Sequence, residues 1–259
     1  SKGRWVVLQN CHLAPRFLFE IEKLLEKESK ADFRLWLTSM PTDTFPVTLL
    51  QRGFKITSEP PRGIKANMLK NYNTYSAKFI ETHVKPYEWK KLLFGITFFH
   101  SVVQERRRFS SLGWNIMYEF SQMDLEISVA QLNSMLKDFE EVPWECLTYS
   151  IAEANYGGRV TDPMDRRLLK VILNTFMSGD VLEDNYKFSE SGVYSSPKTG
   201  DVASYRNFIK GVFPLNDLPE VFGLHANAEI TSGIKESTKL MGTLLSLLPR
   251  VTSDEGMSI

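Results

Sequence analysis

The pattern that decides the fold class lies in residues 5–38, which read WVVLQNCHLAPRFLFEIEKLLEKESKADFRLWLT. The short apolar run Trp5–Leu8 is typical of a strand that is buried on both faces. Apolar residues then recur every three to four positions across Phe17–Leu25, which predicts an amphipathic helix with Pro15 near its first turn. Phe33–Thr38 is a second strand pattern. Strand, helix and strand with short connections predict a parallel α/β sheet.

Further along the chain, the α/β pattern gives way to a helical one. Phe54–Thr57 predicts a third strand, which the proline-rich stretch Glu59–Gly63 ends. From about residue 86 the apolar period becomes 3.6. Four helices joined by short loops are expected there, and they predict a helical bundle. They are the apolar stripe Trp89–Val103, a helix that Ser121 caps, a helix that Pro143 begins, and a helix that Asp162 and Pro163 begin.

The C-terminal part differs in composition from the bundle. Residues 180–230 are richer in Gly, Pro, Ser and Asn, with a brief helical stretch at Tyr205–Lys210, and a last helix is expected from Thr231 to Leu248. The expected division is therefore α/β plus α. It consists of a parallel sheet with helices in residues 1–85, a helical bundle in 86–180, and a linker with a mostly helical extension in 181–259.

The composition is that of an ordinary globular protein. Its 259 residues contain 31 Lys+Arg and 31 Asp+Glu, so the formal net charge is zero. This balance argues against the basic surface that binding to nucleic acid or to an anionic membrane requires. The longest apolar runs, such as Leu92–Ile96, are far shorter than the roughly 20 residues that span a bilayer. Two distant cysteines, Cys11 and Cys146, are expected to be free thiols.

The first residues predict that this sequence is one part of a longer polypeptide. It has no initiator Met, and the first strand pattern begins almost at residue 1. Strands and a helix that would precede Ser1 in a complete α/β core are therefore expected to be missing here. The sheet within residues 1–85 is expected to be incomplete and to leave apolar surface uncovered.

A search for catalytic and metal-binding motifs finds none of the common patterns. No G-x-x-x-x-G-K-[ST], G-x-S-x-G or H-E-x-x-H occurs, and the four histidines have no neighbour at ligand spacing. The end of the first strand is more informative, because an acidic pair commonly holds Mg²⁺ and activates water there in nucleotide-binding α/β folds. Gln9 and Asn10 occupy this place. Amides neither neutralise Mg²⁺ nor accept a proton, so these residues would not support nucleotide hydrolysis. An ordinary buried strand that never took part in nucleotide chemistry fits Gln9 and Asn10 equally well.

Two arginine-bearing stretches complete the set of candidates. In Tyr156-Gly-Gly-Arg159 the glycines permit a turn with φ > 0, and Arg159 comes just before a helix N-terminus. It could reach an anion or a carboxylate there, or it could form structural salt bridges together with Arg166 and Arg167. Arg106–Arg108 end a helical stripe, where cations suit the helix C-terminus better than a ligand site.

An α/β layer followed by a four-helix bundle is the plan of an AAA+ core and its lid, and motifs along nearly the whole chain resemble the dynein heavy chain. The matching region is its sixth AAA+ module and the start of the C-terminal region that follows. Two of these motifs, Gln9-Asn-Cys-His12 and the block Asn216–His225, resemble the corresponding sequences of axonemal dyneins. The motifs are Trp5–Ala14, Phe33–Ser39, Glu59–Gly63, Lys65–Leu69, Gln104–Arg106, Leu112–Trp114, Tyr118–Phe120, Asn155–Val160 and Leu215–His225.

The resemblance implies a non-catalytic structural and allosteric module in a six-module ring. The parent chain would be an ATP-driven, minus-end-directed microtubule motor of the cytoplasm and cytoskeleton, in the axoneme of cilia and flagella. Its partners would be the neighbouring AAA+ modules, microtubules, and dynein light and intermediate chains, with no nucleic acid and no membrane. No cofactor is expected in this part, whereas ATP and Mg²⁺ would bind in other modules. The alternatives are an ATP-binding ATPase module in its own right and a cargo- or adaptor-binding domain on the same fold.

The resemblance also implies roles for individual residues. Gln9 and Asn10 stand at a degenerate Walker B position. Arg52 lies in roughly the segment of an arginine finger, but the preceding module is implied to be non-hydrolytic, which argues against a catalytic role. Arg159 matches the lid's sensor arginine by position. With no phosphate to sense, it is expected to act as a latch between core and lid.

Overall fold

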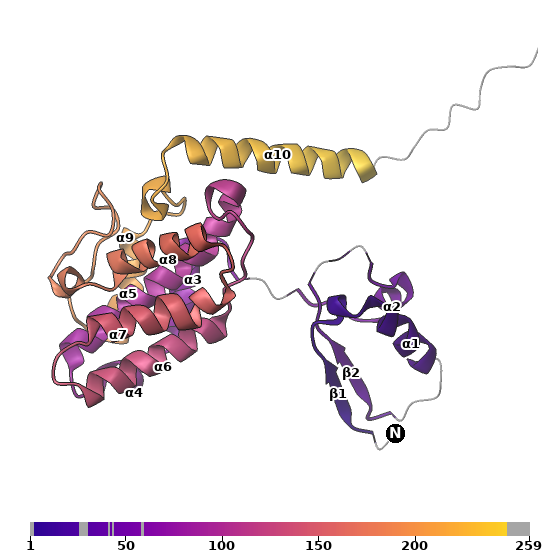
Figure 1. Cartoon of the computed structure of the whole chain (residues 1–259), viewed down its shortest axis with the longest axis horizontal. Helices are drawn as coiled ribbons and strands as arrows, with labels where there is room; N and C mark the ends of the chain where they lie inside the picture. Colours follow the sequence, from indigo (N-terminus) through magenta and orange to yellow (C-terminus); the bar gives the residue numbers. More distant parts are fainter. Residues whose placement is uncertain (1–2, 26–30, 41, 43, 58–59, 248–259) are drawn as a thin grey trace, which may run out of the picture. The chain divides into compact units, whose positions relative to one another are not determined.

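The computed structural model describes residues 3–25, 31–40, 42, 44–57 and 60–247. They belong to two compact units, which divide between Glu59 and Pro60 (Figure 1). We call them the N-terminal unit and the helical unit, and we describe each by itself.

The N-terminal unit contains the predicted strand, helix and strand. β1 (Trp5–Leu8) and β2 (Arg34–Leu37) pair in parallel, with Trp5 opposite Arg34 and Leu8 opposite Leu37. The crossover between them contains a short 3₁₀ turn, η1 (Cys11–Leu13), and α1 (Pro15–Leu25), and α2 (Val47–Arg52) follows β2. The expected parallel pairing is confirmed, and α1 lies in the long crossover connection that two parallel strands require.

The expectation that β1 is buried on both faces is wrong for the described residues. Leu35 and Leu37 share one face of β2 and pack against a small cluster of Cys11, Leu18, Ile21 and Leu49. Trp5 and Val7 are 68% and 55% exposed. The helices α1 and α2 supply apolar side chains to one face only, so the expected uncovered apolar surface is present.

The third expected strand, Phe54–Thr57, is also wrong. These residues follow α2 as irregular chain, and the side chains of Phe54 and Ile56 are exposed. A strand is stabilised by hydrogen bonds to a neighbouring strand, and the described sheet contains only β1 and β2. Among the described residues, this segment therefore has no neighbouring strand with which it could pair.

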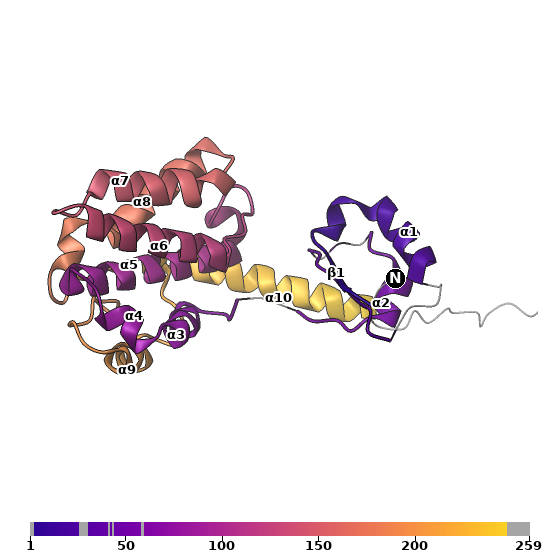
Figure 2. The same cartoon turned by 90° about the horizontal axis from the view of Figure 1, so that it is seen from below.

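The helical unit contains the four predicted bundle helices, although the third is short. Its helix α7 has five residues and continues directly as a π-helix, η3 (Tyr149–Asn155). Figures 1 and 2 show helices α3, α6 and α8 packed around α5, whereas α10 extends away from the bundle. The α-helices are α3 (Ile64–Thr74), α4 (Ala77–Glu81), α5 (Pro86–Glu105), α6 (Gln122–Asp138), α7 (Trp144–Thr148), α8 (Pro163–Phe176), α9 (Val202–Val212) and α10 (Asn227–Leu247). The shorter 3₁₀ segments are η2 (Arg106–Leu112), η4 (Gly157–Arg159), η5 (Gly179–Leu182) and η6 (Pro219–Phe222).

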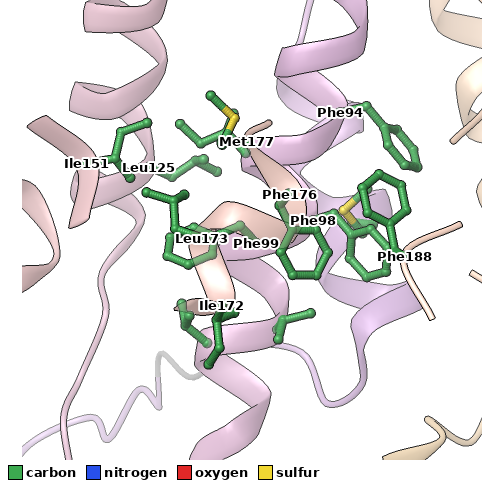
Figure 3. Close-up of a cluster of buried hydrophobic side chains, with 14 of the residues drawn as sticks. Phe94, Phe98, Phe99, Leu125, Ile151, Ile172, Leu173, Phe176, Met177 and Phe188 are labelled. Atoms are coloured by element: carbon green, nitrogen blue, oxygen red, sulfur yellow. The ribbon is translucent and has the colours of Figure 1, made fainter. Parts of the chain in front are cut away.

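The core of this unit is built on α5, which is buried on almost every side from Leu92 to Val103. A helix that is apolar all round must be enclosed by other elements, and α3, α6 and α8 pack against it. Figure 3 shows the aromatic centre, where Phe98 meets Phe176 and Phe188 with ring centroids 4.9 and 5.1 Å apart. Offset and edge-to-face aromatic pairs of this kind add stability beyond the area that they bury.

The compact units do not follow the expected division at residues 85 and 180. Helices α3 and α4 belong to the helical unit, because Ile64, Met68, Tyr72 and Ile80 are buried in its core. Residues that follow position 180 enter the same core, and the ring of Tyr205 in α9 stacks on Tyr72 at 5.5 Å. The apolar faces of α3 and α9 pack against each other, which joins these segments to the bundle.

The last described helix, α10, extends the expected helix 231–248 toward the N-terminus and ends at Leu247. Residue 248 lies outside the described residues. Of the α10 side chains, Ala228 is buried, whereas apolar ones such as Ile234 and Leu244 are exposed. None of the described helices combines the length and apolarity that crossing a membrane would require.

Candidate functional site

The candidate residues divide between the two units. Gln9, Asn10 and Arg52 belong to the N-terminal unit, and Arg159 belongs to the helical unit. We therefore build the strand-end site and the arginine site separately.

Gln9 and Asn10 leave the carboxyl end of β1 in a tight turn. Asn10 has φ 56° and ψ 44°, a left-handed conformation that Asn adopts more readily than most residues. Its backbone N–H donates to the hydroxyl of Thr38 at 3.1 Å, and the N–H of Cys11 donates to the Thr38 carbonyl at 2.9 Å. The turn is thus tied to the residue that follows β2, which leaves the side chains of Gln9 and Asn10 exposed.

A shallow pocket of about 200 Å³ opens beside this turn. Its walls include Leu8, Asn10, Cys11 and Phe17, so it is largely apolar. The Cys11 side chain is buried, and its thiol donates to the Leu8 carbonyl at 3.3 Å. Apart from this hydrogen-bonded thiol, the polar groups in the pocket wall are amides and backbone atoms, which can accept or donate hydrogen bonds but cannot act as general bases.

Arg52 is the last residue of α2, and its side chain is exposed. It forms no hydrogen bond or ion pair with the residues that the structure describes. A cation in the last turn of a helix is favourable to the helix dipole, which accounts for its position without a ligand.

Arg159 lies at the end of η4 and contacts the start of α6. Its Nε donates to the Asp124 carboxylate at 3.0 Å, and its Nη2 donates to the Ser121 hydroxyl at 3.3 Å. The Arg159 side chain is 48% exposed, whereas that of Asp124 is 7% exposed. Both partners belong to the helical unit, so these bonds join two segments of the bundle.

Asp124 also caps the N-terminus of its own helix, α6. Its carboxylate accepts the backbone N–H of Ser121 at 2.7 Å and the Ser121 hydroxyl at 3.1 Å. This resembles a capping box, in which a residue at the third helical position satisfies the N-cap backbone. The spacing Ser121-x-x-Asp124 is visible in the sequence, but only the fold shows that Arg159 approaches it.

The turn with φ > 0 that the glycines before Arg159 would permit is not formed. Neither Gly157 nor Gly158 has a positive φ, and both lie in the 3₁₀ turn η4. Gly157 is required for close approach instead, because a Cβ there would lie 2.1 Å from the carbonyl oxygen of Ala152. That carbonyl belongs to the π-helix η3. The path of the backbone from η3 to Arg159 therefore depends on the absence of a side chain at Gly157.

The cations of Arg106–Arg108 act in tertiary contacts as well as at the end of α5. The buried guanidinium of Arg106 donates to the carbonyls of Gly113 and Phe222. Arg108 forms an ion pair with Glu229 at 2.7 Å. Arg107 forms an ion pair with Glu119 at 3.0 Å. The three arginines thus bind the chain after η2, the carbonyl of Phe222 and the first turn of α10, which makes them structural.

Two further ionisable side chains, both on α5, are buried and have structural partners. The Lys91 ammonium donates to Asp184 at 2.9 Å and to the Pro197 carbonyl at 3.1 Å. His100 Nδ1 lies 2.9 Å from the Tyr156 hydroxyl, and burial lowers the pKa of His100 to about 4. Within the described ranges, no group of three or more His, Cys, Asp or Glu side chains could hold a metal ion.

Comparison with protein families matches both units. The family model "Dynein heavy chain AAA lid domain" covers residues 89–228, and the model "Dynein heavy chain region D6 P-loop domain" covers residues 1–57. The first match coincides with most of the helical unit, and the second coincides with the N-terminal unit.

Individual relatives extend this match to nearly every residue. The chain is 46% identical over 265 residues to dynein axonemal heavy chain 3 of Mus musculus, and 47% identical over 263 residues to dynein axonemal heavy chain 1 of Rattus norvegicus. It is 44% identical over 260 residues to the dynein-1-beta heavy chain of the flagellar inner arm I1 complex of Chlamydomonas reinhardtii. These alignments cover 99%, 100% and 98% of the chain, which spans 6% of the length of each relative.

These relatives are axonemal and flagellar proteins, which agrees with the axonemal versions of the motifs at Gln9–His12 and Asn216–His225. They place the chain in the cytoskeleton of the cilium or flagellum, at the axoneme. The α/β fold of residues 5–37 and the bundle built on α5 are the expected AAA+ core and lid. The chain belongs to the dynein heavy chain family, and it carries the D6 P-loop and AAA lid regions of an axonemal dynein.

Proposed function

We propose that this part of the heavy chain is a non-catalytic structural and allosteric module of the motor ring. It binds no ATP and no Mg²⁺ of its own, and it transmits the motion of neighbouring modules. The observation that carries the proposal is the strand end, where Gln9 and Asn10 replace the acidic pair that nucleotide hydrolysis needs. Their exposed amides can bind by hydrogen bonds, but they supply neither charge for Mg²⁺ nor a base for water.

The whole heavy chain would supply what this part lacks. It would be an ATP-driven, minus-end-directed microtubule motor, with ATP and Mg²⁺ bound in other modules. This part would contact the neighbouring AAA+ modules, and the parent would engage microtubules and the light and intermediate chains. In this setting Arg159, whose described partners Asp124 and Ser121 both lie within the lid, is proposed to hold η4 against α6 inside the lid instead of latching the lid to the core. Arg52 is proposed to be a surface cation with no catalytic role.

The test is calorimetric titration of Mg-ATP into the folded chain, together with ATP turnover of the heavy chain that contains it. We expect no heat of binding at micromolar nucleotide. We also expect that the double substitution Gln9→Asp and Asn10→Glu leaves turnover of the heavy chain within about twofold, because restored acids have no bound nucleotide to act on. Micromolar binding, or a large rise in turnover after the substitution, would favour an ATPase module in its own right.

The second alternative, a cargo- or adaptor-binding domain, makes a different prediction. A pull-down with the chain as bait would then recover other axonemal proteins in preference to neighbouring ring modules. Preferential recovery of ring modules supports the structural role.

A further inference from the structure

The helical unit begins at a connection that needs external support. Residues 60–63 lead into α3, and Gly63, its N-cap residue, has φ 95°. This conformation favours glycine, which has no side chain to accept a hydrogen bond from the first turn of the helix. The first backbone N–H groups of a helix have no partner within the helix, and burial without a partner is costly.

The missing cap comes from a distant segment. Asp217 Oδ2 accepts the backbone N–H of Ile64 at 3.0 Å, across 153 positions of sequence. Ile64 is fully buried and Asp217 is 5% exposed, so water does not readily replace this bond. A carboxylate at a helix N-terminus is also favoured by the helix dipole.

A second bond joins the same two segments. The Lys65 ammonium donates to the Phe213 carbonyl at 2.9 Å. The buried amide of Asn67 also donates to the carbonyls of Pro61 at 2.6 Å and Gly63 at 3.0 Å. The same amide donates to Glu105 at 3.1 Å, so the connection is bound both to α5 and to the chain around Asp217.

The segment that carries Asp217 is itself fastened at further points. Arg106 donates to the Phe222 carbonyl, Arg108 pairs with Glu229, and Arg62 pairs with Glu236 at 2.7 Å. The last pair is more than half exposed on both sides, so it contributes little alone. We call residues 213–236, which include these contacts, the strap.

We propose that the strap is a positioning device for residues 60–64, with Asp217 as the residue that fixes the start of α3. A displacement of the strap would release the Ile64 N–H and loosen residues 60–64 at the start of the helical unit. Its use in the motor rests on the proposed relay role. The coupling itself involves no nucleotide, so its failure can be told apart from failure of that role.

Hydrogen–deuterium exchange of the full chain tests the coupling. Asp217→Ala should raise amide exchange in residues 61–67 by about tenfold or more, because the buried N–H of Ile64 loses its acceptor. Residues in α6 and α8 should be unchanged. Asp201→Ala is the matched control, since Asp201 caps α9 within its own helix through Ser204 at 2.8 Å. It should raise exchange in α9 and leave residues 61–67 unchanged.

Reciprocity separates a coupled strap from a merely stabilising residue, because coupling between two sites acts equally in both directions. Gly63→Ala, which is strained at φ 95°, should raise exchange in residues 213–219. Asp217→Asn, which keeps an acceptor oxygen, should restore much of the protection. Where Asp217→Ala does not fold, Lys65→Met removes only the bond to Phe213 and should raise exchange in both segments. Unchanged exchange at 61–67, or a uniform rise across the helical unit, would overturn the proposal.

Discussion

At the scale of single residues, the polar groups of the helical unit act in pairs that the fold brings together. Arg159 and Asp124 are 35 positions apart, and His100 and Tyr156 are 56 positions apart. Each pair joins α5 or α6 to the stretch around η3 and η4. The environment of each pair decides how much it contributes, because exposure to water weakens an ion pair and burial penalises an unpaired charge.

Arg159→Ala should lower the free energy of unfolding by about 1 kcal/mol, since its guanidinium is half exposed while its partner Asp124 is buried. Urea titration followed by circular dichroism measures this change. Arg167→Ala is the control, because Arg167 is exposed and forms no ion pair within the described part of the chain. Equal stability of the two variants would show that the bond to Asp124 contributes nothing measurable.

His100 makes the stability depend on pH. Burial lowers its pKa from 6.5 to about 4, so between these values the unfolded chain binds a proton that the folded chain does not. Its stabilising contribution is fully present above about pH 6.5 and is lost as the pH falls to about 4, a total of about 3 kcal/mol.

His100→Gln should therefore give a stability that falls less steeply than that of the unsubstituted chain from about pH 7 to about pH 4. Burial raises the pKa of Glu105 and of Asp217, so these carboxyls act in the opposite direction, but they are present in both proteins and cancel in the comparison. Urea unfolding across this range is the measurement. If the free energy of unfolding depends on pH equally in the two proteins, His100 is not the source of this pH dependence.

At the scale of secondary structure, the π-helix η3 decides how the chain reaches the arginine site. A π-helix is wider than an α-helix and rarely extends far, and this one ends where Gly157 passes against the Ala152 carbonyl. The following 3₁₀ turn η4 then presents Arg159 to α6.

The two adjacent glycines provide a matched test of this geometry. Gly157→Ala should lower the free energy of unfolding by about 1–3 kcal/mol, because its Cβ would lie 2.1 Å from a backbone oxygen. Gly158→Ala should be neutral or slightly stabilising, since no atom lies within 4 Å of a Cβ at that position. Thermal unfolding of both variants measures the difference, and similar melting temperatures would mean that η3 adjusts without cost.

At the scale of the whole molecule, two hydrophobic cores share no residue. The N-terminal unit buries a small cluster around Leu18, whereas the helical unit buries an extensive core around α5. Since cooperative unfolding depends on a shared core, the two units are expected to unfold separately.

Leu18→Ala should therefore destabilise only the N-terminal unit, and Leu132→Ala in α6 should destabilise only the helical unit. Each change removes a side chain that is at most 1% exposed, at a cost of about 2–5 kcal/mol. Hydrogen exchange of peptides from α1 and from α5, measured in increasing urea, separates the two transitions. A joint shift of both peptides in either variant would show a single cooperative unit.

The uncovered face of the small sheet predicts a further property. Trp5 and Trp36 lie 5.9 Å apart, and both are exposed. We expect the chain to bind a hydrophobic dye and to self-associate at high concentration, because such apolar surface is normally covered. Val7→Lys with Trp36→Lys should reduce both signals, as judged by dye fluorescence and sedimentation. A strictly monomeric chain that binds no dye would contradict this expectation.

The sequence by itself determined the local elements and the family. β1, α1, β2, α5, α6 and α8 follow from apolar periods, prolines and caps that act within about ten residues. The order of many short motifs indicates the dynein heavy chain. The sequence also shows that two amides, Gln9 and Asn10, occupy the positions where an acidic pair would stand. Local preferences suffice here because helix and strand patterns depend on neighbouring residues.

The tertiary structure alone decided the boundary at Glu59, the partners of Arg159 and the cap on α3. The pattern at Phe54–Thr57 predicted a strand, but strand formation depends on a neighbouring strand that local sequence does not reveal. Asp217 and Ile64 are likewise ordinary residues in sequence, and they meet because α3, α5 and α9 pack in one core. Contacts across 153 positions arise from packing of the whole unit, and no local period encodes them.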